Sequence, residues 1–256
     1  MMLKAFFSIL LTAALAAPAA ADQYGGFQQF SDKGSLKPFA RDLGGILGSS
    51  SFHSGRPLGF SGFDVGLRGG LQFSPDKRDK VLRDKGVKAF GLPWVQAEVG
   101  LPMRFDVFIC GASFEGLTVS GGGLRWGVFK GGDKPWAFQL LVAGLGHAFV
   151  HQHFSGVHAG ANIVGSMGNQ YIVFYTGPGF DWTRLVARSA TPTGTADAFP
   201  AGETVRAFEY RCTAGIKLKP FAAVTSNKIL PYLYLGAGYV LVHGESGIES
   251  SLGIRF

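Results

Sequence analysis

Four histidines lie close together in the middle of the chain, at positions 147, 151, 153 and 158. Neutral imidazole side chains bind zinc and copper, and His151 and His153 would share one face of an extended strand. His147, His151 and His153 are therefore weak candidates for a metal site. Their spacing matches no ligand motif, so the favoured interpretation is a polar rim, and we expect neither a metal nor a cofactor.

Hydrolytic chemistry needs a nucleophile, or a water molecule, held against a base. The nearest Ser–His pair, His53-Ser54, lies in a segment predicted to be a linker, and Asp181 is only a remote candidate partner for one of the histidines. The glycine clusters at 66–70 and 121–123 do not begin a helix after a strand, and no GxxxxGK[ST] pattern occurs. We assign no catalytic residue and expect the chain not to be an enzyme.

The elements that position these residues are predicted to be strands. From Gly59 onward apolar residues alternate with polar or small ones; Phe63, Val65 and Leu67, for example, oppose Asp64 and Gly66. If the apolar face points outward, the polar face lines an interior. Its charged members are Asp64, Arg68, Glu98, Arg104, Asp106, Arg125, Glu209, Arg211, Lys217 and Arg255. We count about ten strands, with eight to twelve as the range, and only the register of residues 136–150 is ambiguous.

The composition suits closely packed strands. The 256 residues include 39 glycines and 23 phenylalanines, only 16% are charged, and the formal net charge is +7. No apolar run reaches the length of a membrane helix. Basic residues do not alternate with aromatic ones in a nucleic-acid-binding stripe, so we expect no nucleic-acid partner. Cys110 and Cys212 are predicted to face opposite sides of the sheet and to stay unpaired.

The first 58 residues are organised differently. Residues 1–21 combine Lys4, an apolar run and the small residues Ala19-Ala20-Ala21, which is typical of a cleaved signal peptide. In residues 22–58 a short amphipathic helix is predicted, capped by Ser35 and stopped by Gly48, with residues 49–57 as a linker. Its apolar face makes it a candidate plug: Leu36, Phe39, Leu43, Ile46 and Leu47. Residues 59–256 form the predicted strand domain.

The last ten residues carry the clearest strand pattern. Ile248, Leu252, Ile254 and Phe256 share one parity, and the chain ends on an aromatic ring. This stretch resembles the terminal recognition strand of Gram-negative outer-membrane β-barrels. From Gly59 to Phe256 the sequence looks like the domain-of-unknown-function type of these barrels, and more loosely like fatty-acid-type transporters. The resemblance implies an all-β, antiparallel, up-and-down transmembrane barrel, exported to the cell outer membrane and assembled through Phe256.

The function expected from this resemblance is porin-like: transport or binding of a small solute or apolar ligand through the lumen. The alternative is a structural or surface-interaction barrel with a filled lumen, and an outer-membrane hydrolase is less favoured. The expected partners are outer-membrane lipid, lipopolysaccharide and the barrel-assembly machinery. Loop 74–90 carries a net charge of +3 and is the candidate contact for lipopolysaccharide phosphates.

Glycine is frequent on the predicted inner face, for example at Gly66, Gly70, Gly100 and Gly127. Glycine weakens a strand and usually marks a close backbone approach or a bend. The helix is therefore expected to enter or seal the barrel. Two alternatives remain open, in which the helix lies at the membrane surface or the glycines serve only barrel curvature.

Overall fold

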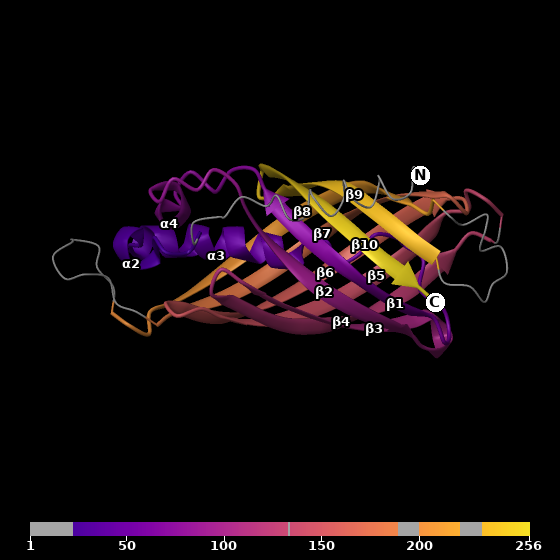
Figure 1. The fold of residues 1–256 in the computed structure, drawn as a ribbon, viewed down its shortest axis with the longest axis horizontal. Helices are drawn as coiled ribbons and strands as arrows, with labels where there is room; N and C mark the ends of the chain where they lie inside the picture. Colours follow the sequence, from indigo (N-terminus) through magenta and orange to yellow (C-terminus); the bar gives the residue numbers. More distant parts are fainter. Residues whose placement is uncertain (1–22, 133, 189–199, 221–231) are drawn as a thin grey trace, which may run out of the picture.

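Alternation of exposed and buried side chains runs along the strands, and the sheet that they form closes on itself. The computed structural model describes residues 23–132, 134–188, 200–220 and 232–256, which form a closed antiparallel barrel of ten strands (Figure 1). The strands are β1 (Phe63–Gln72), β2 (Phe90–Gly100), β3 (Phe105–Phe114), β4 (Leu117–Lys130), β5 (Gln139–Val150), β6 (Phe154–Gly168), β7 (Ile172–Ala187), β8 (Thr204–Leu218), β9 (Tyr232–Val242) and β10 (Glu245–Arg255). Each strand pairs with its sequence neighbours, and β1 pairs with β10. The predicted fold class is confirmed.

The barrel closes through its first and last strands. Asp64 lies opposite Arg255, and the N–H of Phe256 donates to the carbonyl oxygen of Phe63 across 2.7 Å. We call the end of the barrel at which β1 begins and β10 finishes the Phe256 end. The opposite end, which carries helix α2 (Phe27–Phe30) and helix α4 (Lys80–Arg83), is the α2 end (Figure 1).

The outer face of the barrel is apolar. Leu67 is 55% exposed and Ile109 is 67% exposed, while their polar neighbours Arg68 and Glu98 are buried. Strand β5, whose register was ambiguous, turns Leu141, Ala143 and Leu145 inward. Both cysteines are free, with Cys212 exposed and Cys110 half-buried. The inward and outward assignment made from the sequence is thus reproduced in the strands.

Helix α3 (Lys33–Gly48) begins three residues earlier than predicted. Asp32 is the N-cap, and its carboxylate accepts from the N–H of Ser35 at 2.7 Å, while the Ser35 hydroxyl accepts from the N–H of Asp32 at 2.8 Å. This reciprocal pair is a capping box, so Ser35 is part of the cap without being the N-cap itself. Pro38 lies inside the helix, beyond its first turn.

Residues 49–58 are not the solvated linker that the sequence suggested. Ser49, Ser51, Phe52 and His53 are buried, because the chain continues from α3 through the interior of the barrel toward the Phe256 end. We call residues 23–58 the lumen segment. Residues 1–21, the expected signal peptide, lie outside the described residues. No helix within the described part of the chain is long and apolar enough to cross a membrane.

The main core lies inside the barrel at the α2 end. Leu36, Phe39, Leu43 and Leu47 of α3 pack there, all at most 2% exposed. The inward-facing residues that surround them are apolar and include Leu92, Trp94, Leu117, Phe149, Phe154 and Leu185. Burial of these side chains is the main force that holds the helix in place, since fully burying a large apolar side chain stabilises by roughly 1.5–3 kcal/mol.

Candidate functional site in the barrel lumen

Three glycines bring helix α3 against the barrel wall. A Cβ at Gly45 would collide with the side chain of Val242, and one at Gly44 would collide with the hydroxyl of Thr183. At Gly48 the obstacle would be the Asp181 and Arg211 side chains. The helix can approach the barrel wall this closely only because these three positions carry no side chain.

Asp42, which is buried in the second half of α3, anchors the helix to the barrel at the α2 end. Its carboxylate accepts from the side-chain amide of Gln72 at 2.9 Å and from the N–H of Asp76 at 2.8 Å. His243, in the turn between β9 and β10, places Nε2 2.9 Å from the same carboxylate and Nδ1 2.9 Å from Glu209. These contacts join the helix to three separate parts of the barrel.

Two titrating groups of this anchor lie outside the strands. Burial acts to lower the pKa of His243, but the carboxylates of Asp42 and Glu209 outweigh it and raise that pKa to about 9. Burial, followed by the negative charge of Asp42, also raises the pKa of Asp79 to about 9. At neutral pH the imidazole of His243 and the carboxyl group of Asp79 are therefore both protonated.

The middle of the lumen is crossed by a network of buried ion pairs. Glu98 lies 2.8 Å from Arg68 Nη2 and also pairs with Arg125, which in turn approaches Asp106 at 3.7 Å. Arg68 makes a further pair with Asp64 at 3.8 Å. Pairing of opposite charges in this way avoids the large cost of an isolated buried charge.

A second group of paired side chains lies under Gly44 and Gly48 of the helix. Arg211 Nε donates to Asp181 at 3.1 Å, and His158 Nε2 lies 3.3 Å from the other oxygen of that carboxylate. His147 Nδ1 is 3.1 Å from His158 Nδ1. All of these side chains are buried. The helix therefore covers a site where the structure brings two histidines and a carboxylate together.

Residues 49–58 are held by inward-facing acidic residues through main-chain hydrogen bonds. The N–H of Ser50 donates to Glu249 at 2.9 Å, and the N–H of Leu58 donates to Asp106 at 2.9 Å. Arg255 Nη2 donates to the carbonyl oxygen of Leu58 at 2.8 Å. These acceptors come from β3 and β10, so the segment is fixed on two sides of the lumen.

The inward glycines have two separate roles. Gly70, Gly100 and Gly127 lie against the lumen segment, where a Cβ would meet Ser49, Gly59 and Pro57 respectively. Gly215 and Gly253 instead leave room for large inward side chains of neighbouring strands, the phenol rings of Tyr175 and Tyr234. The lumen segment therefore explains only some of the glycines on the inner face of the barrel.

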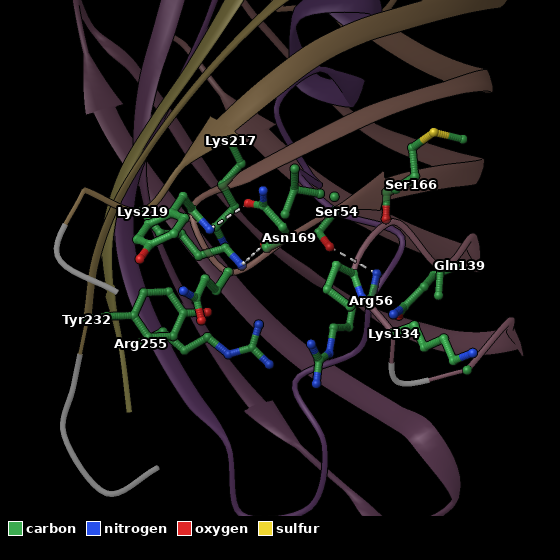
Figure 2. Close-up of a pocket in the computed structure, with 18 of the residues that line it drawn as sticks. Ser54, Arg56, Lys134, Gln139, Ser166, Asn169, Lys217, Lys219, Tyr232 and Arg255 are labelled. Atoms are coloured by element: carbon green, nitrogen blue, oxygen red, sulfur yellow. Dashed lines mark hydrogen bonds between the residues drawn. The ribbon is translucent and has the colours of Figure 1, made fainter. Parts of the chain in front are cut away.

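A cavity of about 920 Å³ remains in the lumen at the Phe256 end (Figure 2). Its lining comes from residues 54–56 of the lumen segment, from the connections between β4 and β5 and between β6 and β7, and from the ends of β8, β9 and β10. Five cationic side chains line it: Arg56, Lys134, Lys217, Lys219 and Arg255. Figure 2 shows the guanidinium groups of Arg56 and Arg255 pointing into this space.

The ten charged residues expected in the lumen fall into two groups. Eight of them are buried inside the barrel, whereas Arg255 is half-buried at the cavity and Arg104 lies outside the strands. Arg104 belongs to the 3₁₀ turn η1 (Pro102–Arg104), where Met103 and Arg104 both have positive φ. Pro102 begins this turn, and the Nε of Arg104 lies close to the inward-facing Gly127.

The histidines and the Ser–His pair considered as candidates in the sequence do not come together at one place in the structure. Among the described residues, no group of three or more His, Cys, Asp or Glu side chains is placed to hold a metal ion. His147 contacts His158, whereas His151 and His153 lie beside the rings of Tyr24 and Phe27. His53 stacks on Tyr234 at 4.6 Å between ring centroids and contacts Arg68, while the Ser54 hydroxyl accepts from the N–H of Arg56.

The sequence pattern places Gln72 and Asp181 on the inward faces of their strands and Asp42 on the polar side of the helix, but it does not indicate every residue of the site. His243 was passed over as a lumen contact because a single polar residue at the end of an element carries no periodic signal. Arg56 was passed over because residues 49–57 were interpreted as a linker.

The fold and lumen thus define a class, a closed ten-stranded barrel with an internal helix. The sequence matches no protein-family model and no curated protein. Among solved structures, the N-terminal barrel domain of OprF from Pseudomonas aeruginosa is similar at 11% identity and a TM-score of 0.31, over 77% of this chain and 99% of that domain. Neisserial surface protein A has 12% identity and a TM-score of 0.31, over 80% of this chain and 98% of that one.

The translocator domain of the autotransporter NalP from Neisseria meningitidis has a TM-score of 0.39 at 8% identity, over 77% of this chain and 88% of that domain. Similarity at this level identifies neither an activity nor a ligand. The function therefore has to be argued from the residues of this chain.

Proposed function

We propose that this protein is an outer-membrane β-barrel whose lumen is closed by its own N-terminal segment. The observation that carries the proposal is the burial of α3 and residues 49–53 inside the barrel. Of the functions expected from the sequence, the filled barrel is favoured over open, porin-like transport, because apolar packing and buried ion pairs occupy the α2 end and the middle of the lumen.

The outer surface supports a membrane location. A closed barrel with an apolar exterior is a stable way to cross lipid with strands, since every strand has two partners. Aromatic rings surround the Phe256 end in neighbouring pairs: Phe63 with Phe256, Phe105 with Trp126, and Trp136 with Phe174, at centroid distances of 5.9–6.1 Å. Such a ring of aromatic residues is typical of the lipid–water interface.

The orientation that we infer places the Phe256 end on the periplasmic side. In barrels of this class short turns face the periplasm and longer loops face outward. The long connection 73–89 lies at the α2 end and packs α4 beside α2 and α3, with Lys80 paired to Asp32. Residues 189–199, in the connection between β7 and β8 at the same end, lie outside the described residues.

Closure is tested by comparing the full-length mature protein with a deletion of residues 22–50 in planar lipid bilayers. We expect the full-length protein to be electrically silent and the deletion variant to conduct, because removal of α3 opens the core at the α2 end. The wild-type protein acting as an open pore would refute the closure.

A second variant covers the case in which the deletion fails to assemble. Leu43→Cys, made in a background with Cys110→Ala and Cys212→Ser, keeps α3 present. We expect the new thiol to resist a water-soluble maleimide in the folded protein and to react after heat denaturation. Rapid labelling of the folded protein would contradict the proposal.

A further inference from the structure

The cavity at the Phe256 end has an unusual charge balance for a space inside a protein. Five cations line it, and no Asp or Glu side chain is present among its described lining residues. Elsewhere in the lumen arginines are matched with carboxylates, as Arg68 and Arg125 are with Glu98. Within the described part of the chain, none of the five cavity cations has a carboxylate oxygen within 4.0 Å.

The contacts of these cations leave positive charge available to a ligand. Lys219 Nζ donates to the carbonyl oxygen of Asn169 at 3.3 Å, and Lys217 Nζ lies 3.8 Å from the centre of the Tyr234 ring. Neither partner carries a full negative charge. Burial, together with the positive charges of Arg255 and Arg56, lowers the pKa of Lys219 to about 8. The positively charged side chains of the cavity therefore repel one another.

We propose that this cavity is a binding site for a phosphate-bearing small molecule. A phosphate group offers several acceptor oxygens to the forked guanidinium groups of Arg56 and Arg255, and more than one negative charge to the lysines. Its volume of about 920 Å³ lies within the range usual for ligand pockets, roughly 300–1,000 Å³. Ser54, Asn169 and Tyr232 add polar groups and an aromatic ring around the same space.

This inference goes beyond closure of the lumen and does not depend on it. The lumen segment contributes Arg56 to the cavity and separates the cavity from the α2 end, so the site opens toward the Phe256 end. Phosphate groups that could reach it belong either to soluble periplasmic molecules or to lipid head groups of the inner leaflet. The chemistry of recognition is the same for both sources.

The test uses folded full-length protein in a non-ionic detergent and isothermal titration calorimetry at low salt. The probes are inorganic pyrophosphate and a short-chain phosphatidic acid. The test variant is Arg56→Gln with Lys219→Gln, because Arg56 is exposed and neither side chain is part of the buried ion-pair network. The matched control is Lys33→Gln with Lys37→Gln, which removes two exposed cations of α3 at the opposite end.

We expect at least one probe to bind, with a dissociation constant that rises tenfold or more in the test variant and stays unchanged in the control. At pH 8 binding should also take up protons, because a bound anion raises the pKa of Lys219; titrations in buffers of different ionisation enthalpy measure this.

Preference for pyrophosphate would indicate a soluble ligand, and preference for phosphatidic acid a lipid head group. The proposal is wrong if neither probe binds, or if both variants bind as the wild type does. Gel mobility before and after heating establishes that each variant is folded, and Arg56→Glu alone provides a second measure of the same charge effect.

Discussion

His243 and Asp42, which are 201 positions apart in the sequence, form an ion pair with 2.9 Å between Nε2 and Oδ1. This contact ties the turn between β9 and β10 to helix α3. It is surrounded by other charged groups, namely Glu209 and Arg41 on one side and Asp76 and Asp79 of the loop before α4 on the other. The protonation state of this cluster therefore influences how firmly the helix is held.

The anchor is expected to weaken as pH rises from about 6.5 to 9. The pKa of His243 is raised from 6.5 to about 9, so its contribution is complete below pH 6.5 and is lost at higher pH. That contribution is at most about 3 kcal/mol. The pKa of Asp79 is raised from 3.8 to about 9, so its contribution falls as pH rises through that whole range and acts in the same direction.

The contribution of His243 is isolated by comparing thermal stability of the wild type with that of His243→Gln. The difference between the two proteins should be largest near pH 6 and should shrink by pH 9.5. A difference that is constant across this range would show that the imidazole does not titrate with the anchor.

A single methyl group at Gly45 should disturb the packing of helix α3 against the barrel wall. Gly45→Ala places a Cβ against Val242 and is expected to destabilise by about 1–3 kcal/mol, even though alanine favours helix formation. Gly34→Ala, at an exposed position of the same helix, is the matched control and should be neutral or stabilising. The melting temperatures of both variants measure this difference in stability. Equal effects would mean that the absence of a side chain at Gly45 is not needed for the helix to pack against the barrel wall.

Assembly is expected to depend on the terminal aromatic ring. Phe256→Ser removes a side chain that is 62% exposed and pairs with Phe63 at the closing seam, so interior packing is little affected. Less folded barrel should be recovered from outer membranes, with unfolded chain in the periplasm. Fractionation with heat-modifiability gels measures this; normal assembly of the variant, or a mature chain that purifies as a soluble monomer without detergent, would refute the membrane assignment.

The loop before β2 is expected to bind lipopolysaccharide through its phosphates. Lys77, Lys85 and Lys88 are exposed, whereas Lys80 is paired with Asp32 and Arg83 donates to the carbonyl oxygen of Pro75. Changing the three exposed lysines to glutamine should weaken binding to lipopolysaccharide micelles, most strongly at low salt. Unchanged binding at low salt would remove this proposal, and retained pyrophosphate binding would establish that the variant is intact.

The strands were predictable because a barrel with a lipid-facing exterior imposes one simple rule on every residue. The alternation of Val95, Val99 and Ile109 against Glu98 and Asp106 reports that rule directly. Boundaries were less certain: a turn such as Pro102–Arg104 depends on backbone angles rather than on polarity.

The lumen was harder to predict, because its contacts join residues far apart in the sequence. The apolar face of α3 was visible, but the side chains that receive it, such as Trp94 and Phe154, look the same as membrane-facing residues in a one-dimensional pattern. Residues 49–57 have the composition of a linker. Residues 49–53 are nevertheless buried, and Glu249 and Asp106 accept hydrogen bonds from the N–H groups of Ser50 and Leu58 in the same segment.

The path of residues 23–58 sets the order of events in assembly. Gln23 is hydrogen-bonded to Glu115 and Gly91 at the α2 end, whereas Phe63 begins β1 at the other end, so this stretch is encircled once β1 has paired with β10. The helix must be enclosed before β1 pairs with β10, or residues 23–58 must be threaded through the closed barrel afterwards as an extended chain. A rigid, prefolded cargo fused just ahead of Gln23 would therefore act as a stopper against threading, whereas an unstructured peptide of the same length would not.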